Sequence, residues 1–385
     1  MPDESNDAEV TGSNERYPDA TIAGARIAID ARYLRRPGMG IHTYLSAGIQ
    51  LLLDEGAEVS LLANFPEDEA ATSYSGTRWE GFGSKRNIVW EQINLPRHIR
   101  KQTFDFYWAP GNSGIPFLSL GRTHSVSSTH DIIPLRLPRI YLYQRPGFAL
   151  PYFVWTFAAI LRSDILITGS QASADDINRT FHRRPVVIPS NLQIVQETDV
   201  KVKVPANLQD TSYLVFNGGM DPRKNVKNLL EGFAIVIQQY PDLHLAIMGN
   251  RSEMLLPLIS KLGIRENVIL TGFVDESEKS AILSGAKAMV YPSLYEGFGL
   301  PLLEAFAADL PLVTSRNSAL SEIAGDAAIY INPLEPFSIA EGILTILQDE
   351  IANEHRERGR QRLKEFNVFE SRRKFVEVFS SSFKG

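Results

Sequence analysis

The sequence predicts an α/β protein of two domains, each organised around a parallel sheet. The chain has 385 residues, which is more than one hydrophobic core usually holds. Residues 213–332 alternate short apolar strands with helical segments, the pattern of consecutive βαβ units. Residues 26–53 open the chain in a related way, as a strand, a loop with glycines and a helix.

The first predicted domain covers residues 21–190. The polar, acidic residues 1–20 before it are expected to be disordered. A strand at 26–30 and a helix at 41–53 are followed by strands expected at 58–63, 87–90, 105–109, 123–131, 164–170 and 186–189. Ser170 has the residue type and position of an N-cap for a helix at 171–178.

The second predicted domain covers residues 205–369. Its strands are expected at 213–219, 243–249, 268–272, 288–293, 311–315 and 328–332. The regular pattern is lost between residues 191 and 211, and we place the connection between the domains there. Helices are expected after Pro336 and up to Phe379.

Composition excludes several classes of protein. The chain has no cysteine, so disulfides, thiolate zinc sites and thiol nucleophiles are ruled out. No apolar run reaches eighteen residues and no apolar leader is visible, so we expect a cytoplasmic location. The net charge is −6, but residues 26–190 hold 18 Lys and Arg against 14 Asp and Glu. This mild basicity is compatible with an anionic partner or a membrane surface, and no nucleic-acid motif is present.

The most informative stretch is residues 291–308. A buried strand ends there, a loop with Gly297 and Gly299 follows, and Pro301 occupies the start of a helix. Two carboxylates, Glu296 and Glu304, therefore flank a helix N-terminus whose free N–H groups attract an anion. An anion site framed by two carboxylates that accept hydroxyl groups suits a sugar joined to a diphosphate.

Seven residues separate Glu296 from Glu304, and this spacing resembles the E-x7-E signature of retaining glycosyltransferases of family four, which have the GT-B fold. The sequences at 292–301 and 318–327 also resemble that family. The resemblance is dense from about residue 212 to 345. It implies two Rossmann-like domains whose parallel sheets face a central cleft, with a C-terminal helix at 370–385 crossing back onto the first, acceptor-binding domain.

The resemblance assigns roles to individual residues. Glu296 would contact the donor sugar and oppose the positive charge that develops on it, while Glu304 would accept the ribose hydroxyls. The departing diphosphate would be stabilised by the loop of Gly218 and Gly219, by Arg223 and Lys224, and by the backbone of Phe298, Gly299 and Leu300. Many relatives have an arginine where this chain has Gly219, so the phosphate contact of Arg223 departs from the family pattern and Lys224 matches it better.

The first domain is expected to supply the other side of the site. His130 and Asp131 follow a predicted strand, at the end where open α/β sheets bind ligands, and the family has a similar histidine at the donor sugar. Gly38 and Gly40 form a loop that would touch the diphosphate or the acceptor; a simple turn is the alternative. We assign His130 a catalytic role with Glu296, Arg223 and Lys224, and Asp131 a place at the acceptor.

The implied reaction is transfer of a hexosyl group, with retention, from a nucleotide diphosphate sugar to a hydroxyl of a glycan or polyprenyl-linked acceptor. GDP-mannose is the leading donor, because the Arg-Lys-Asn turn at 223–225 is similar to mannosyl- and rhamnosyltransferases of polysaccharide assembly. The chain has no Asp-x-Asp motif, so we expect no metal and no cofactor, with fixed cations in their place. Two alternatives stay open: an epimerase or phosphorylase on the same fold, and a non-catalytic sugar-binding protein.

Residues 136–162 allow two interpretations. Four arginines alternate there with seven aromatic residues. The segment is either a peripheral contact with the inner face of the cytoplasmic membrane or a set of core aromatics with solvated arginines. Pro146 and Pro151 are expected to interrupt any long amphipathic helix.

Overall fold

The computed structural model describes residues 22–35, 40–144, 146–192 and 204–380. The predicted tail at 1–20, Gly38 of the first glycine loop, Arg145 and much of the expected connection at 191–211 lie outside the described residues. No helix of the described residues is both long and apolar enough to cross a membrane.

The N-terminal half is built on a parallel sheet of seven strands within the described residues, in the order β3-β2-β1-β4-β5-β6-β7. The strands are β1 (Arg26–Asp30), β2 (Glu58–Ala63), β3 (Arg78–Gly81), β4 (Phe106–Ala109), β5 (His124–Ser128), β6 (Ile165–Thr168) and β7 (Val186–Val187). The pairs are all parallel, for example with Ala28 opposite Ser60 on one side and Tyr107 on the other. Strands β1, β2, β4 and β6 are almost entirely buried, which explains their mostly apolar character.

The C-terminal half repeats this plan with six parallel strands in the described residues, in the order β10-β9-β8-β11-β12-β13. They are β8 (Tyr213–Asn217), β9 (His244–Met248), β10 (Val268–Gly272), β11 (Met289–Tyr291), β12 (Leu312–Ser315) and β13 (Ala328–Ile331). The predicted α/β class with two Rossmann-like parallel sheets is therefore confirmed.

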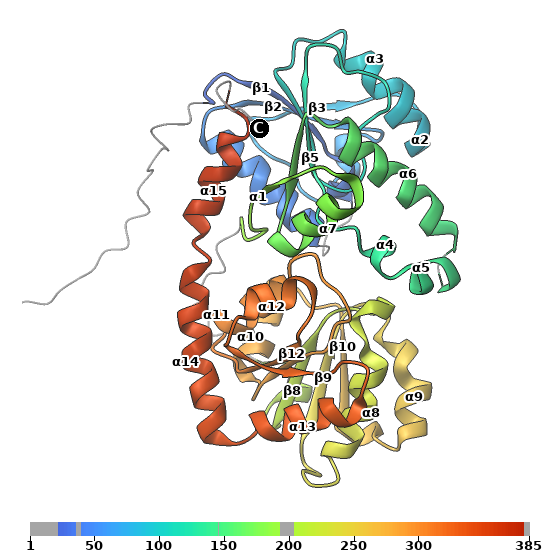
Figure 1. Ribbon diagram of the computed structural model, residues 1–385. Coiled ribbons are helices and arrows are strands. Elements are labelled where there is room, and N and C mark those ends of the chain that lie inside the picture. The colour runs from blue at the N-terminus through green and yellow to red at the C-terminus, as the bar shows by residue number, and fades with distance from the viewer. Residues whose placement is uncertain (1–21, 36–39, 145, 193–203, 381–385) are drawn as a thin grey trace, which may run out of the picture.

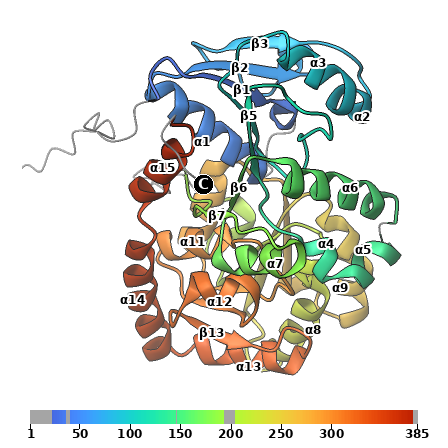
Figure 2. The ribbon, with the colours of Figure 1, turned by 45° about the horizontal axis from the view of Figure 1, so that its top comes forward.

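Helices cover both sheets (Figures 1 and 2). In the N-terminal half they are α1 (Gly40–Asp54), α2 (Asn87–Val89), α3 (Leu95–Ile99), α4 (Ile133–Arg136), α5 (Pro138–Gln144), α6 (Pro146–Arg162) and α7 (Gln171–Phe181). In the C-terminal half they are α8 (Val226–Val236), α9 (Leu256–Leu262), α10 (Glu276–Gly285), α11 (Leu300–Ala307), α12 (Ser318–Ala324), α13 (Pro336–Ile346) and α14 (Asp349–Glu365), and α15 (Val368–Glu377) is the last helix of the described residues.

The strand orders locate the ligand-binding edge of each sheet. The direction of winding reverses between β1 and β4 in one sheet and between β8 and β11 in the other. Open α/β sheets bind ligands outside the carboxyl ends of their strands at such a reversal. The loops after β8 and β11 contain the two candidate motifs, at 218–225 and 292–299.

The chain returns to the N-terminal half through its last two helices, which run along one side of the molecule (Figure 1). The side chains of Phe375 and Phe379 are buried in the core of the N-terminal half, whereas Phe366 packs against the core of the other half. The Asn191 amide group donates to the Phe366 carbonyl at 3.0 Å and accepts from the Ser371 hydroxyl at 2.9 Å. The outgoing and returning segments thus meet at Asn191.

One predicted strand is wrong. Residues 87–90 begin a helical segment formed by α2, the π-helical turn η3 (Trp90–Asn94) and α3, and the third strand of the sheet is β3 instead. The apolar run 88–90 is too short to separate strand from helix by periodicity. Burial of Trp90 and of the Glu91 carboxylate, which pairs with Arg32 at 2.9 Å, accompanies the helical form.

The prediction that prolines interrupt a long helix in residues 136–162 is wrong for Pro151, which lies inside α6. Helix α6 begins at Pro146 and continues through Pro151 to Arg162. Proline is tolerated at the first helical position, and the missing N–H of Pro151 removes a single backbone bond near the start of a seventeen-residue helix. Tyr141 is buried, as the core interpretation expects, while Val154, Phe157 and Leu161 are exposed, so the membrane contact stays a prediction.

Candidate active site

Glu296 lies at the centre of a buried network in the loop after β11. One of its carboxylate oxygens accepts hydrogen bonds from Lys224 Nζ at 2.7 Å, Ser293 Oγ at 2.7 Å and the Tyr291 hydroxyl at 3.0 Å. The other oxygen pairs with the Arg223 guanidinium. The motif predicts Glu296 beside a ligand; the structure adds that two cations and two hydroxyls hold its carboxylate in one orientation.

The charges around Glu296 determine its protonation. Burial alone would raise the pKa of Glu296, but the Arg223 and Lys224 cations outweigh burial and lower the pKa of Glu296 to about 2. Glu296 is therefore ionised at neutral pH. Burial lowers the pKa of Lys224, with Glu296 acting in the opposite direction.

This network predicts a pH dependence of stability. The pKa of Glu296 lies below its ordinary value of 4.5, so its contribution to folding is present above that pH and is lost as pH falls toward about 2. We expect Glu296→Gln to be less stable than the wild type at pH 7, because two buried cations lose their partner. The difference should shrink below about pH 4.5. Urea unfolding of both proteins between pH 7 and 3 measures this, and a constant difference would contradict it.

Arg223 and Lys224 belong to a short turn rather than to the start of a helix. The turn η5 (Pro222–Lys224) is capped by the Asp221 side chain, which accepts from Arg223 N at 3.1 Å, and α8 begins two residues after Lys224. Cations before a helix N-terminus oppose the helix dipole. Here their pairing with Glu296 compensates this effect, because the turn folds back onto the loop after β11.

Glu304 lies on α11, and both of its oxygens have protein partners. Lys279 Nζ of α10 donates to Oε1 at 2.8 Å, and the Asn217 amide at the end of β8 donates to Oε2 at 2.8 Å. Each carboxylate oxygen can accept more than one hydrogen bond, so Glu304 keeps the capacity to accept ligand hydroxyls. Its carboxylate is held in place from two neighbouring elements.

The four glycines of the two loops are required for two different physical reasons: a backbone angle that disfavours side chains, or a lack of space for one. Gly219 and Gly299 have φ angles of 63° and 105°, which L side chains rarely adopt. Gly297 has no such angle, yet a Cβ atom there would lie 2.7 Å from the His130 carbonyl oxygen and 2.8 Å from the Asp131 Cβ. Gly218 likewise faces the Phe216 ring, which leaves no space for a side chain. Phe298 is buried, and Leu300 is the first residue of α11.

His130 and Asp131 are brought against the Glu296 loop through Gly297. The His130 ring contacts the Pro110 carbonyl at 2.9 Å and the Tyr44 ring at a centroid distance of 4.8 Å, and its backbone N–H donates to Asn112. Burial lowers the pKa of His130 and raises that of Asp131, so the imidazole is held neutral at pH 7. Gly40 begins α1, and nothing lies within 4 Å of the position its Cβ would take.

Several residues of this site were not singled out by sequence analysis. They are Tyr291, Ser293, Ser318, Asn217, Lys279 and Asn112. Tyr291 and Ser293 lie within the stretch that carries the motif, and their hydroxyls next to a strand end were the available signal. No local pattern marks Lys279 or Asn217, which reach Glu304 across 25 and 87 positions of sequence.

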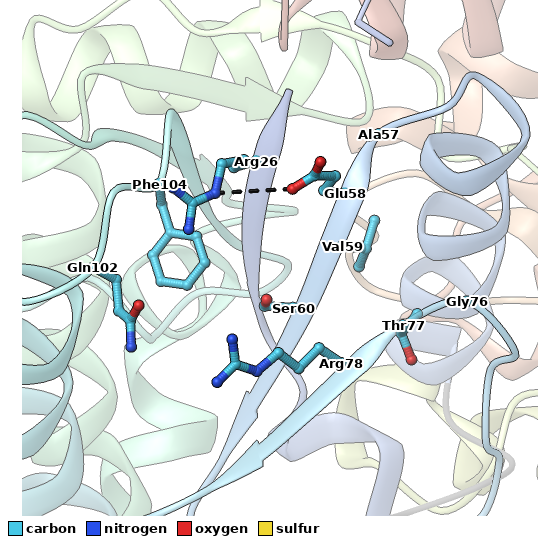
Figure 3. A pocket seen from close by; sticks show the side chains of 10 residues that line it. All are labelled: Arg26, Ala57, Glu58, Val59, Ser60, Gly76, Thr77, Arg78, Gln102 and Phe104. Carbon is cyan, nitrogen blue, oxygen red and sulfur yellow. Dashed lines mark ion pairs between the residues drawn. The ribbon is translucent and has the colours of Figure 1, made fainter. Parts of the chain in front are cut away.

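A hollow of about 470 Å³ lies elsewhere, at the amino ends of β1, β2 and β3 (Figure 3). It is lined by Arg26, Glu58, Arg78 and Phe104 among others, and its one drawn ion pair joins Arg26 to Glu58 at 3.9 Å. Ligands of open α/β sheets bind at the opposite edge, so this hollow does not enlarge the site. Within the residues that the structure describes, no group of three or more His, Asp or Glu side chains could hold a metal ion.

The sequence is similar to those of known glycosyltransferases. Residues 198–366 match the family model described as Glycosyl transferases group 1. The chain is 34% identical over 241 residues to O-antigen chain mannosyltransferase B of Escherichia coli, covering 59% of this chain and 62% of that protein. It is 32% identical over 218 residues to MMP alpha-(1->4)-mannosyltransferase of Mycolicibacterium hassiacum, covering 56% and 50%. The alignments thus leave more than a third of each relative unmatched.

Similarity of fold extends over nearly the whole chain. The structure of WaaG, described as a glycosyltransferase involved in lipopolysaccharide biosynthesis, superposes with a TM-score of 0.73 at 16% identity, covering 93% of this chain and all of WaaG. The two parallel sheets with their facing loops are the GT-B arrangement. Residues 198–366 thus match the glycosyl transferases group 1 family model, and the described chain has the GT-B fold.

Proposed function

We propose that this protein is a glycosyltransferase that moves a hexosyl group from a nucleotide diphosphate sugar to a hydroxyl of a glycan or lipid-linked acceptor. The observation that carries the proposal is the arrangement of Arg223, Lys224 and Glu296 at the winding reversal of the second sheet, with Glu304 on the adjoining helix. The family match and the mannosyltransferase relatives support it.

The two cations retain hydrogen-bond donors for a diphosphate. Arg223 donates to Glu296 and to the Tyr295 carbonyl, and Lys224 donates to Glu296 and to the Tyr291 hydroxyl. Each cation thus uses two N–H groups, whereas a guanidinium has five and an ammonium three. The remaining donors, together with free N–H groups at the start of α11, would neutralise the departing diphosphate. Such preorganised donors are among the largest contributions to catalysis of group transfer.

Glu296 and His130 would act on the sugar. In the transition state the anomeric carbon becomes positive, and the ionised Glu296 carboxylate would oppose that charge. Neutral His130 would orient the sugar from the N-terminal half. The bond from the anomeric carbon to the diphosphate oxygen breaks, the acceptor oxygen bonds to the same face with retention, and the leaving diphosphate takes the acceptor's proton.

The donor sugar that the relatives favour is mannose, and we propose GDP-mannose as the donor. A thermal-shift panel of GDP-mannose, UDP-glucose, UDP-N-acetylglucosamine and dTDP-rhamnose tests this, because a ligand of the folded state raises the melting temperature. We expect the largest shift with GDP-mannose and none with free mannose. NMR of the product formed on a polyprenyl-linked acceptor should show the α-anomer. A shift with free sugar alone would favour a sugar-binding protein, and product formation from inorganic phosphate would favour a phosphorylase.

Activity should not require a metal ion. We expect EDTA to leave the initial rate unchanged, because the site offers Arg223, Lys224 and the start of α11 where other transferases bind a metal to the diphosphate. The measurement compares rates in EDTA with and without added Mn²⁺ or Mg²⁺. Loss of activity in EDTA that either ion restores would contradict metal independence.

Helices α5 and α6 carry exposed apolar side chains. Leu142 of α5 and Val154, Phe157 and Leu161 of α6 are between 37% and 50% exposed, and the last three lie on one helix face. The exposed Arg139 and Arg162 flank them, which suits anionic lipid headgroups. We propose that this surface holds the protein at a bilayer, where a lipid-linked acceptor resides.

Vesicle flotation tests the membrane contact. We expect the wild type to float with vesicles of phosphatidylglycerol and phosphatidylcholine, and Val154→Ser/Phe157→Ser to stay in solution. The matched control is Phe369→Ser, which replaces a phenylalanine of similar exposure on α15. Equal flotation of the double variant and the control would contradict the assignment of this surface.

A further inference from the structure

Helix α7 and its N-cap in the N-terminal half contact the Glu296 loop of the other half at the two residues that flank Glu296. The Gly297 carbonyl oxygen accepts hydrogen bonds from Ser170 Oγ at 2.6 Å and from Ser173 Oγ at 3.0 Å. On the other side of Glu296, the Tyr295 hydroxyl donates to the Asp176 carboxylate of the same helix. Figure 2 shows α7 beside α12 where the two halves meet.

The contacts are buried and use the full capacity of their acceptor. Ser170, Ser173 and Gly297 are all buried. A carbonyl oxygen has two lone pairs, and the two hydroxyls occupy both. Ser170 at the same time caps α7 by accepting from Ser173 N at 3.1 Å, as the sequence predicted. Loose packing between the two halves would not require two buried hydroxyl groups to donate to the same carbonyl oxygen.

The orientation of the Gly297 carbonyl also sets the direction of the next N–H group. A trans peptide unit is planar, so the Phe298 N–H points opposite to the Gly297 C=O. With that carbonyl directed at α7, the N–H is directed away from it. Among the described residues, the Phe298 N–H has no hydrogen-bond acceptor, which leaves it available to a ligand anion.

The C-terminal half holds α7 in return. Both oxygens of Glu322 on α12 accept from the N-terminus of α7, from Gln171 N at 2.9 Å and Ala172 N at 2.8 Å. A carboxylate at this position also interacts favourably with the helix dipole. Ser318, at the start of α12, accepts from Glu296 N at 2.9 Å. Helices α7 and α12 and the Glu296 loop therefore form a closed set of contacts.

We propose that Ser170 and Ser173 are positioning residues of the donor site: they fix the Gly297–Phe298 peptide, and with it the Glu296 loop, in the geometry that turnover requires. This inference rests on the proposed function and names the element of the N-terminal half that orients the Glu296 loop. Gly297 makes the approach possible, because its missing side chain admits the His130 carbonyl.

Ser173→Ala is the first test, because it removes one donor to Gly297 and keeps the Ser170 cap. We expect kcat for hexosyl transfer to fall about tenfold, the loss of roughly one hydrogen bond, with the Kd of GDP unchanged within twofold. Ser173→Thr retains a hydroxyl and should recover most of kcat. Thr180→Ala, on the exposed face of the same helix, is the matched control and should leave kcat unchanged. Wild-type kcat in Ser173→Ala would overturn the proposal.

Amide hydrogen exchange provides a readout that does not depend on activity. In Ser173→Ala the segment 295–299 should exchange several-fold faster than in the wild type, while the segment 213–217 of β8 should be unchanged. Equal amide exchange rates at 295–299 in Ser173→Ala and the wild type would overturn the positioning role of Ser173. If the wild type transfers no hexosyl group from any nucleotide sugar while exchange changes as expected, the proposed function fails and the positioning of the loop stands.

Discussion

Glu296→Gln should lower kcat about 100- to 1,000-fold, because it removes the negative charge that opposes the developing positive charge on the sugar. The amide has nearly the same shape and can still accept from Ser293 and Tyr291. Binding of GDP should be retained or strengthened, since Arg223 and Lys224 lose their carboxylate partner and become more available to phosphate.

Steady-state kinetics and calorimetry separate these two effects. The matched control is Glu341→Gln, which replaces an exposed glutamate on α13 and should leave both kcat and the Kd of GDP unchanged. A Glu296→Gln protein with near-normal kcat would remove Glu296 from the chemistry. If Glu296→Gln instead kept a normal kcat but bound GDP much more weakly, Glu296 would contribute to ground-state binding.

Lys224→Met should lower kcat about 100-fold, because one of the two cations that neutralise the departing diphosphate is lost. The Kd of GDP should rise about 10- to 100-fold, the value of a charge-assisted hydrogen bond. Folding should survive the change, because Glu296 keeps its pairing with Arg223 and methionine has a similar length.

Lys227→Met is the control for this variant. Lys227 is three residues further along, its side chain is 71% exposed, and it lies 3.8 Å from Glu231 on the same helix. Thermal melts, GDP calorimetry and kcat should all match the wild type. A Lys224→Met protein that binds GDP and turns over as well as Lys227→Met would show that the diphosphate does not contact this lysine.

The sequence by itself determined the fold class and the main motif, because both depend on local patterns. Alternating apolar strands and helices predict parallel sheets regardless of how distant elements pack. Glu296, the two glycines and Pro301 lie within six residues of one another, so strand, loop and helix start could be read together. The same holds for Ser170, whose capping partner is only three residues away.

The tertiary structure alone decided which residues complete the site. Helix α7 reaches Gly297 across 127 and 124 positions of sequence, and Lys279 reaches Glu304 across 25. It also decided that residues 87–90 are helical, where a short apolar run is compatible with either structure. The physical reason is common to these cases: local preferences come from neighbouring residues, whereas hydrogen bonds between elements exist only after the chain has folded and brought them together.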